Sequence, residues 1–256
     1  MLRNLIVRCA TMLGLATAAG TVPAAEHDAK ADKAWQAAYD ARQAYFEKSV
    51  GPLPRDILKM ANMIGVWPGG GLFEIPAKKL GPGLSMYTTF GFTNPDMPTS
   101  VRMAQFASSP GAAQGTLQAK TAAPKVPGRA GYGYEIVVVA DSGAEWPLGF
   151  LQWAVVAELG NDAGLLDRVE KYDGLTVEKI DTGAGEPVNV LIGKAQAPLP
   201  TGTSLPNGKM ELLVATTITD EEMRWSMQNG RGALAEKLRA AGVGQISRPG
   251  RPSVVP

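Results

Sequence analysis

The feature that most constrains the fold is one segment at 131–153, which reads GYGYEIVVVADSGAEWPLGFLQW. After Glu135 the run to Ala140 is continuously apolar, which is typical of a strand buried on both faces. Pro147 suits the first turn of a helix, because its missing N–H needs no partner there. Residues 148–159 are apolar nearly all round, so that helix is also expected to be mostly covered. The segment therefore predicts a central strand and a packed helix.

A helical segment is expected before this body. Residues 28–48 are rich in alanine and predict a helix. One face of it carries side chains at helical spacing: Trp35, Ala38, Arg42 and Tyr45. The run WPGGG at 67–71 is a strong break. We therefore divide residues 26–256 into an N-terminal helical segment, residues 26–66, and a main body, residues 67–256.

The main body mixes strand and helix patterns. The segments predicted to be extended are 72–75, 85–92, 101–107, 134–140, 176–180, 188–192 and 210–217. Thr219 and Glu222 have the spacing of a capping box at the start of a helix. Residues 108–128 show no periodicity and predict a long loop. Because helices and strands follow one another without a βαβ rhythm, we expect an α+β fold with a mixed β-sheet flanked by helices.

The first 25 residues have the pattern of a secretory signal peptide. Arg3 and Arg8 precede an apolar centre at 10–19, and small residues follow, so cleavage is expected near Ala24 or Ala25. The apolar run is too short to span a bilayer comfortably. An uncleaved N-terminal anchor is the alternative. The pattern predicts a periplasmic or secreted protein with no stable membrane span after cleavage.

The scarcity of cysteine and histidine excludes several kinds of site. Cys9 is the only cysteine and lies in the predicted signal, and His27 is the only histidine and lies beside the cleavage point. A thiol nucleophile, a thiolate or multi-histidine metal site and a Ser-His-Asp triad are therefore not expected. The formal net charge of +1, without a long basic run, gives no reason to expect nucleic-acid binding. No cofactor is expected.

Two sets of side chains are candidates for function. Glu135 or Glu145, with a second carboxylate, would suit a hydrolase, because glycosidase-like catalysis uses two carboxylates across a cleft. An ion pair or a hydrogen bond to loop backbone is the structural alternative for Glu135. The aromatic residues Tyr132, Tyr134 and Trp146 would suit a partner-binding surface, where aromatic anchors are favoured. Packing in the core is the alternative for these three.

Four segments, in order along the chain, resemble motifs of the suppressor-of-fused domain. GYGYEIVVVADSGAEWPLGFLQWAVVAEL is similar to the central strand, loop, Trp-Pro and helix of that family. MYTTFGFTN resembles its Thr-x-Gly segment, with Thr89, Gly91 and Thr93 in matching places. LLVATTITDEEMRWSMQNGRGALAEKL is similar to its apolar strand and acidic helix start, and RPGRPSVV resembles the ending of bacterial members. The resemblance covers residues 72–256.

This resemblance implies a protein-binding domain and not an enzyme. Animal members of the family hold a short peptide as an added strand between two lobes, and bacterial members resemble partner-binding proteins that neutralise toxins. We therefore expect an exported domain that binds another protein or peptide in an immunity-like role. Its candidate binding residues are Tyr132, Tyr134, Glu135 and Trp146. The alternatives are a periplasmic carboxylate-dependent hydrolase and a structural envelope protein that oligomerises through its Ala-rich helix.

Overall fold

The computed structural model describes residues 29–54, 71–98, 100–103, 107–109, 112–114, 117–120 and 125–256. The predicted signal peptide, residues 1–25, lies outside them. The helices are α2 (Ala29–Ser49), α3 (Trp146–Val155), the π-helical turn η1 (Val156–Gly160), α4 (Leu165–Tyr172), α5 (Asp220–Asn229) and α6 (Arg231–Ala240). The strands are β1 (Gly71–Pro76), β2 (Leu84–Phe90), β3 (Ser100–Met103), β4 (Ala107–Ser109), β5 (Ala112–Gln114), β6 (Leu117–Lys120), β7 (Arg129–Asp141), β8 (Leu175–Ile180), β9 (Val188–Lys194), β10 (Gly202–Leu205) and β11 (Gly208–Ile218).

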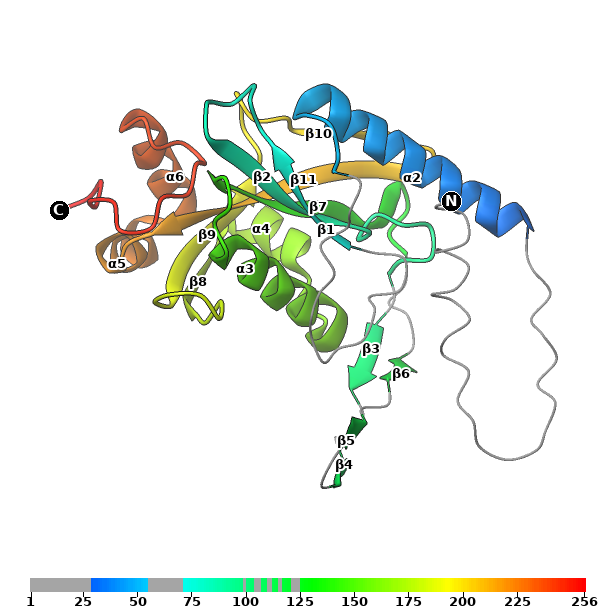
Figure 1. The fold of residues 1–256 in the computed structure, drawn as a ribbon. Coiled ribbons are helices and arrows are strands. Elements are labelled where there is room, and N and C mark those ends of the chain that lie inside the picture. The colour runs from blue at the N-terminus through cyan, green and yellow to red at the C-terminus, as the bar shows by residue number, and fades with distance from the viewer. Residues whose placement is uncertain are drawn as a thin grey trace.

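A seven-stranded mixed sheet forms the centre of the molecule (Figure 1). Its strand order is β1-β2-β7-β11-β9-β8, and β10 pairs with the first part of β11. The neighbours are antiparallel except for β7 and β11, which run parallel. The carboxyl ends of β7 and β11 therefore lie at the same edge of the sheet, where α3 and α5 begin. The predicted α+β fold, with a mixed sheet flanked by helices and an N-terminal helix, is confirmed.

Side chains of β7 alternate between two hydrophobic layers. Tyr134, Ile136 and Val138 pack with α3, η1 and α4 on one face. Val137 and Val139 pack with α2 and β10 on the other face. Both sets are buried, and each such aliphatic side chain contributes about 1.5–3 kcal/mol of transfer free energy. The predicted strand with two buried faces is confirmed, and Figure 1 shows helices on both sides of it.

The starts of two helices follow from their local sequence. α3 begins at Trp146, with Pro147 in its first turn. Thr219 and Glu222 form the predicted capping box of α5, in which each side chain accepts a hydrogen bond from the other residue's backbone N–H. Gly149 of α3 lies so close to the loop after β8 that a Cβ there would stand 1.9 Å from the carbonyl oxygen of Thr182. This glycine therefore fixes how closely the helix and the loop approach.

Helix α2 shares its core with the sheet. Phe46 is buried in the layer that also contains Phe73 of β1. Tyr39 packs edge-on against Phe90 of β2. The hydroxyl oxygen of Tyr45 accepts a hydrogen bond from the backbone N–H at the start of β10, at 2.9 Å. The described part of the N-terminal helical segment thus belongs to the same folded unit as the sheet.

The expectation of a single long loop at 108–128 is wrong in part. β3 pairs with β6 and β4 pairs with β5, both antiparallel. These two-stranded ladders lie away from the main sheet (Figure 1). Strands of three or four residues are too short to show the alternation by which a strand is recognised in sequence.

Candidate functional site

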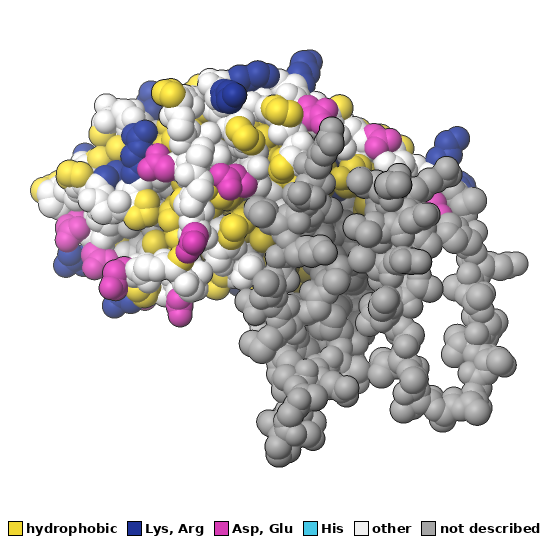
Figure 2. Space-filling view, viewed as in Figure 1, with side chains coloured by type: hydrophobic (Ala, Val, Ile, Leu, Met, Phe, Trp, Pro, Cys, Tyr) yellow, Lys and Arg dark blue, Asp and Glu magenta, His cyan; other side chains and the backbone are white. Residues whose placement is uncertain are grey.

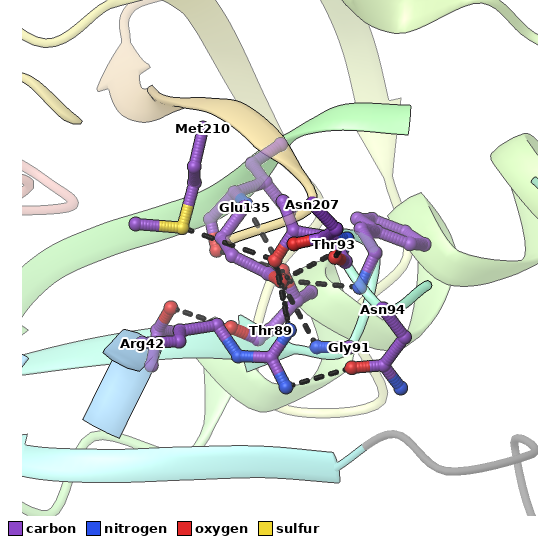
Figure 3. Close-up of polar contacts among 11 residues, drawn as sticks. Arg42, Thr89, Gly91, Thr93, Asn94, Glu135, Asn207 and Met210 are labelled. Carbon is purple, nitrogen blue, oxygen red and sulfur yellow. Dashed lines mark hydrogen bonds and ion pairs between the residues drawn. The ribbon is translucent and has the colours of Figure 1, made fainter. Parts of the chain in front are cut away.

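Glu135 of β7 is the centre of a buried hydrogen-bond network on the α2 face of the sheet (Figure 3). Its carboxylate is 0% exposed. It accepts hydrogen bonds from the backbone N–H groups of Gly91, Phe92 and Thr93 at 3.0, 3.3 and 3.1 Å. The hydroxyls of Thr89 and Thr93 each donate another at 2.7 Å. A buried carboxylate is tolerated only with such donors, so the segment after β2 is shaped around this side chain.

Arg42 of α2 completes the network. Its guanidinium, also 0% exposed, lies 3.3 Å from Oε1 of Glu135. It donates to Thr93 Oγ1 and Asn94 Oδ1, both at 2.8 Å, and lies 4.1 Å from the centre of the Phe90 ring. Burial lowers the pKa of Arg42, and the charge of Glu135 opposes that shift. Because the two charges come from different elements, the ion pair fixes α2 on the sheet.

Glu158 is a second buried glutamate, in η1. Its carboxylate accepts a hydrogen bond from the hydroxyl of Tyr134 at 2.7 Å. It also accepts from the backbone N–H groups of Gly164 and Leu165, at 3.1 and 3.0 Å, at the start of α4. Burial and the neighbouring Glu158 raise the pKa of Tyr134 well above its usual value. This carboxylate joins β7 to the beginning of α4.

Glu222 is a third buried glutamate, in α5. Both terminal nitrogens of Arg251 donate to its carboxylate at 2.6 Å, and the backbone N–H of Val254 donates at 2.8 Å. Burial alone would raise the pKa of Glu222, but the hydrogen bonds from Arg251, Val254 and Thr219 outweigh it and hold the pKa below its usual range. This glutamate fastens the C-terminal segment to α5.

The four residues expected to bind a partner do not share one surface. Tyr134 is 1% exposed and Glu135 is fully buried, so their polar atoms bond within the molecule. Trp146 is 9% exposed at the start of α3. Tyr132 is half-buried, and its ring packs edge-on against Phe92. Only Tyr132 and Trp146 therefore reach the surface.

Glu135 and Glu145, each a candidate for hydrolysis with a second carboxylate, lie too far apart to be partners of one another. Glu135 faces α2, whereas Glu145 is exposed beyond the far end of β7. At about 3.3 Å per strand residue, the stretch of β7 after Glu135 is on the order of 20 Å long. Pairs of glycosidase carboxylates are about 5–9.5 Å apart. Glu135 and Glu145 therefore do not form such a pair.

The described residues show neither a metal-binding cluster nor a helix that could cross a membrane. Those residues include no group of three or more His, Cys, Asp or Glu placed to hold a metal ion. Among the described helices, none combines the length and the apolar character needed to cross a membrane.

Strand β8 has one open edge. It pairs with β9 and, among the described strands, with no other. Leu175 and Val177 are half-buried against the core, whereas Glu178 and Lys179 are exposed. Lys179 has φ of +51°, and the register shifts between Val177 and Ile180. Bulges and charges of this kind restrict indiscriminate strand pairing, so the regular first half of β8 is the part open to another strand.

The comparisons with known proteins agree with this fold. The family model described as suppressor of fused protein (SUFU) matches residues 53–252. A search of the curated proteins finds no match. A solved structure titled "the Sufu-Fu complex crystal structure" is similar with a TM-score of 0.50 and 13% identity, over 86% of this chain and 92% of that chain. A second, the crystal structure of Drosophila suppressor of fused, has a TM-score of 0.40 and 12% identity, over 72% and 42%.

The family match covers most of the described main body, and the Sufu-Fu structure shares its fold. The motifs that carry the resemblance lie in β2 and the turn after it, in β7, α3 and η1, in β11, α5 and α6, and in the C-terminal segment after α6. In the structure they pack around the central strands, with the carboxylate of Glu135 bonded to Thr89, Gly91 and Thr93. The resemblance is confirmed: this chain belongs to the suppressor of fused protein family.

Proposed function

We propose that this chain is a non-enzymatic domain that binds another protein, and that the partner pairs with the open edge of β8. The observation that carries the proposal is this edge, which is bonded to β9 on one side only among the described strands. A related chain has been solved in a Sufu-Fu complex, which supports a polypeptide partner. Of the four residues expected to bind it, Tyr132 and Trp146 remain candidates because they are the two that reach the surface.

The first half of β8 has the chemistry of a strand acceptor. Added strands gain affinity from main-chain hydrogen bonds and specificity from pockets for alternate side chains. Leu175 and Val177 share the core-facing side, and Thr176 lies between them, half-buried. Cross-strand side-chain pairs contribute about 0.2–1 kcal/mol each, so a matched segment of a few residues would gain both register and affinity.

The carboxylate-dependent hydrolase is less well supported. Glu135, Glu158 and Glu222 are each buried and surrounded by donors from their own chain. Their oxygens hold elements together, and the exposed Glu145 is far from Glu135 along β7. A general acid or base needs a carboxylate that a substrate can reach, and none of these three offers that.

The place of action is part of the same proposal. The signal-peptide pattern at residues 1–25 supports a location in the periplasm or outside the cell. There the domain would sequester or neutralise a secreted protein, in an immunity-like role. A pull-down from the envelope fraction, read by mass spectrometry, would provide the partner for the tests that follow.

The test uses two proline variants of β8, Thr176→Pro and Val177→Pro. Successive N–H groups of a strand point to opposite sides, so one of these residues directs its N–H to β9 and the other to the open edge. Proline at the outward position is tolerated in an edge strand. We expect this variant to keep the thermal midpoint of the wild type and to lose at least tenfold in affinity for the partner.

The matched control is Glu47→Lys, on the exposed side of α2, which should leave affinity unchanged. The proline that removes a hydrogen bond to β9 should lower the melting temperature. The melting temperatures therefore show which of the two N–H groups points to β9 and which points to the open edge. Unchanged affinity in the stable proline variant would show that the partner does not use this edge.

A further inference from the structure

A groove opens where β11 ends and α5 begins. Two adjoining cavities, of about 390 and 230 Å³, share Thr217, Ile218, Thr219, Pro249 and Gly250 in their linings. They therefore form one elongated depression. The larger cavity extends to Trp146 and the loop before β9, and the smaller one extends along the C-terminal segment to Arg251.

The position of the groove follows from the parallel pair in the sheet. In open sheets, ligands bind in the crevice outside the carboxyl ends of parallel strands. β7 and β11 are the parallel pair here, and α3 and α5 begin just beyond them. Gly149 holds the loop after β8 close against α3. That loop forms a wall of the groove, so the wall is fixed by packing.

One hydroxyl of the lining has no hydrogen-bond partner among the described residues. Thr217 is 5% exposed, and its Oγ1 is buried and unbonded. Its side chain shares a face of β11 with Leu213 and Ala215, which pack in the hydrophobic layer that contains Trp146. The backbone N–H of Thr217, in contrast, donates to the hydroxyl oxygen of Ser247. An unbonded hydroxyl is costly to bury, but this oxygen is closed to solvent, so it lies beneath the surface of the groove.

The groove also has apolar walls. The apolar residues that line it are Trp146, Ala184, Pro187, Val188, Ile218 and Pro249. Pockets that combine apolar walls with a few polar groups are typical of ligand sites. The larger cavity has room for an apolar side chain against the indole of Trp146.

The charges of the groove are separated along its length. Glu186 and Asp220 line the larger cavity, and Arg248 lines the smaller one. All three are exposed, and within the described residues neither Glu186 nor Arg248 forms an ion pair. Arg251 is already paired with Glu222. On the visible face, Asp and Glu side chains gather near β8, β9 and α5, with a few Lys and Arg among them (Figure 2).

We propose that this groove receives an extended segment of the protein partner. A basic side chain of the segment lies towards Glu186 and Asp220, an apolar side chain lies against Trp146, and an acidic side chain lies towards Arg248. The inference rests on the proposed function and adds a second contact, which selects the partner by its charge pattern.

The test uses short peptides as probes of the purified protein. They are the acetylated and amidated peptides Lys-Thr-Leu-Thr-Glu and Glu-Thr-Leu-Thr-Lys, and the dibasic Lys-Thr-Leu-Thr-Lys. Amide and indole shifts are followed by ¹H–¹⁵N correlation spectra. We expect saturable shifts at 217–220 and at the indole N–H of Trp146 with a mixed-charge peptide, and about fivefold weaker binding of the dibasic one, as expected for an exposed charge contact.

The variant Arg248→Glu should transfer the preference to the dibasic peptide. The matched control Lys78→Glu makes the same charge change on an exposed loop residue between β1 and β2, and should keep the wild-type preference. Absence of saturable shifts in the groove with all three peptides would overturn the inference. So would an unchanged preference in Arg248→Glu.

The two proposals fail in distinguishable ways. Loss of partner affinity in the stable β8 proline variant, without peptide binding in the groove, would refute the groove alone. Peptide binding in the groove, with full partner affinity in the same proline variant, would refute the β8 edge alone.

Discussion

Replacing Glu135 by glutamine should destabilise the protein by about 3–5 kcal/mol, the usual cost of removing one partner of a buried ion pair. In the least unfavourable orientation, the amide nitrogen takes the place of Oε2. There it faces the backbone N–H of Phe92, which donates to that oxygen in the wild type, and two donors then meet. The hydroxyl of Thr89 can turn to accept, but a backbone N–H cannot. The neutral amide also leaves Arg42 charged and buried.

The converse change, Arg42→Met, should cost less, about 2–3 kcal/mol. It removes three hydrogen bonds of a charged guanidinium, worth about 1.5–3 kcal/mol each, but it also removes the cost of burying that charge, which offsets most of the loss. Glu135, however, keeps the five donors supplied by Gly91, Phe92, Thr93 and Thr89. The double variant should be less destabilised than the sum of the two single variants, by about 1–3 kcal/mol.

Urea unfolding, followed by tryptophan fluorescence and circular dichroism, gives the free energy of unfolding of all three variants. Coincident transitions and a constant dependence on urea justify the comparison of free energies. The exposed variant Glu47→Gln on α2 is the control and should stay within about 0.5 kcal/mol of the wild type. A cost below about 1 kcal/mol for Glu135→Gln, or strict additivity of the two changes, would refute the view that this pair holds α2 on the sheet.

Two further predictions concern other contacts. Since the pKa of Glu222 is lowered on folding, its contribution to stability is present above the unfolded-state pKa of about 4.3 and is lost as pH falls through the lower folded value. Arg251→Met should therefore reduce the loss of stability as the pH falls. Urea titrations at several pH values give the free energy of unfolding, and an equal pH dependence in the variant and the wild type would contradict this. Gly149→Ala places a methyl group against the carbonyl of Thr182 and should lower stability by about 1–3 kcal/mol, measured by thermal unfolding. An unchanged melting temperature would show that the loop moves away freely.

The sequence predicts those parts of the fold that depend on local pattern. The central strand, the Trp-Pro helix start and the capping box of Glu222 are all confirmed, because each is decided by residues a few positions apart. The sequence does not predict α4 or β10. β10 has four residues, and its pairing with β11 defines it as a strand. Such an element depends on a distant neighbour, which a periodicity does not show.

The site was harder to predict than the fold. The sequence suggests catalysis or partner binding for Glu135, because it does not show that the donors to this carboxylate lie in the segment after β2 and in α2, more than 40 residues away. The sequence contains one sign that a buried ion pair is present. Arg42 lies on the same helix face as Trp35, Ala38 and Tyr45, and an arginine on a face of this kind indicates a buried partner. Tyr134 likewise finds its acceptor, Glu158, only through the fold.

The Arg42–Glu135 pair also affects when the chain can fold as it is synthesised. The two residues are 93 positions apart, so α2 leaves the ribosome long before β7 exists. Until then, the partly synthesised chain lacks the anion that its future core requires, and a compact state with Arg42 inside it would be penalised. Closing so long a loop also costs entropy before any contact is gained. A polypeptide that completes its core this late is suited to remaining unfolded during translocation, as the leader expected from its sequence would require.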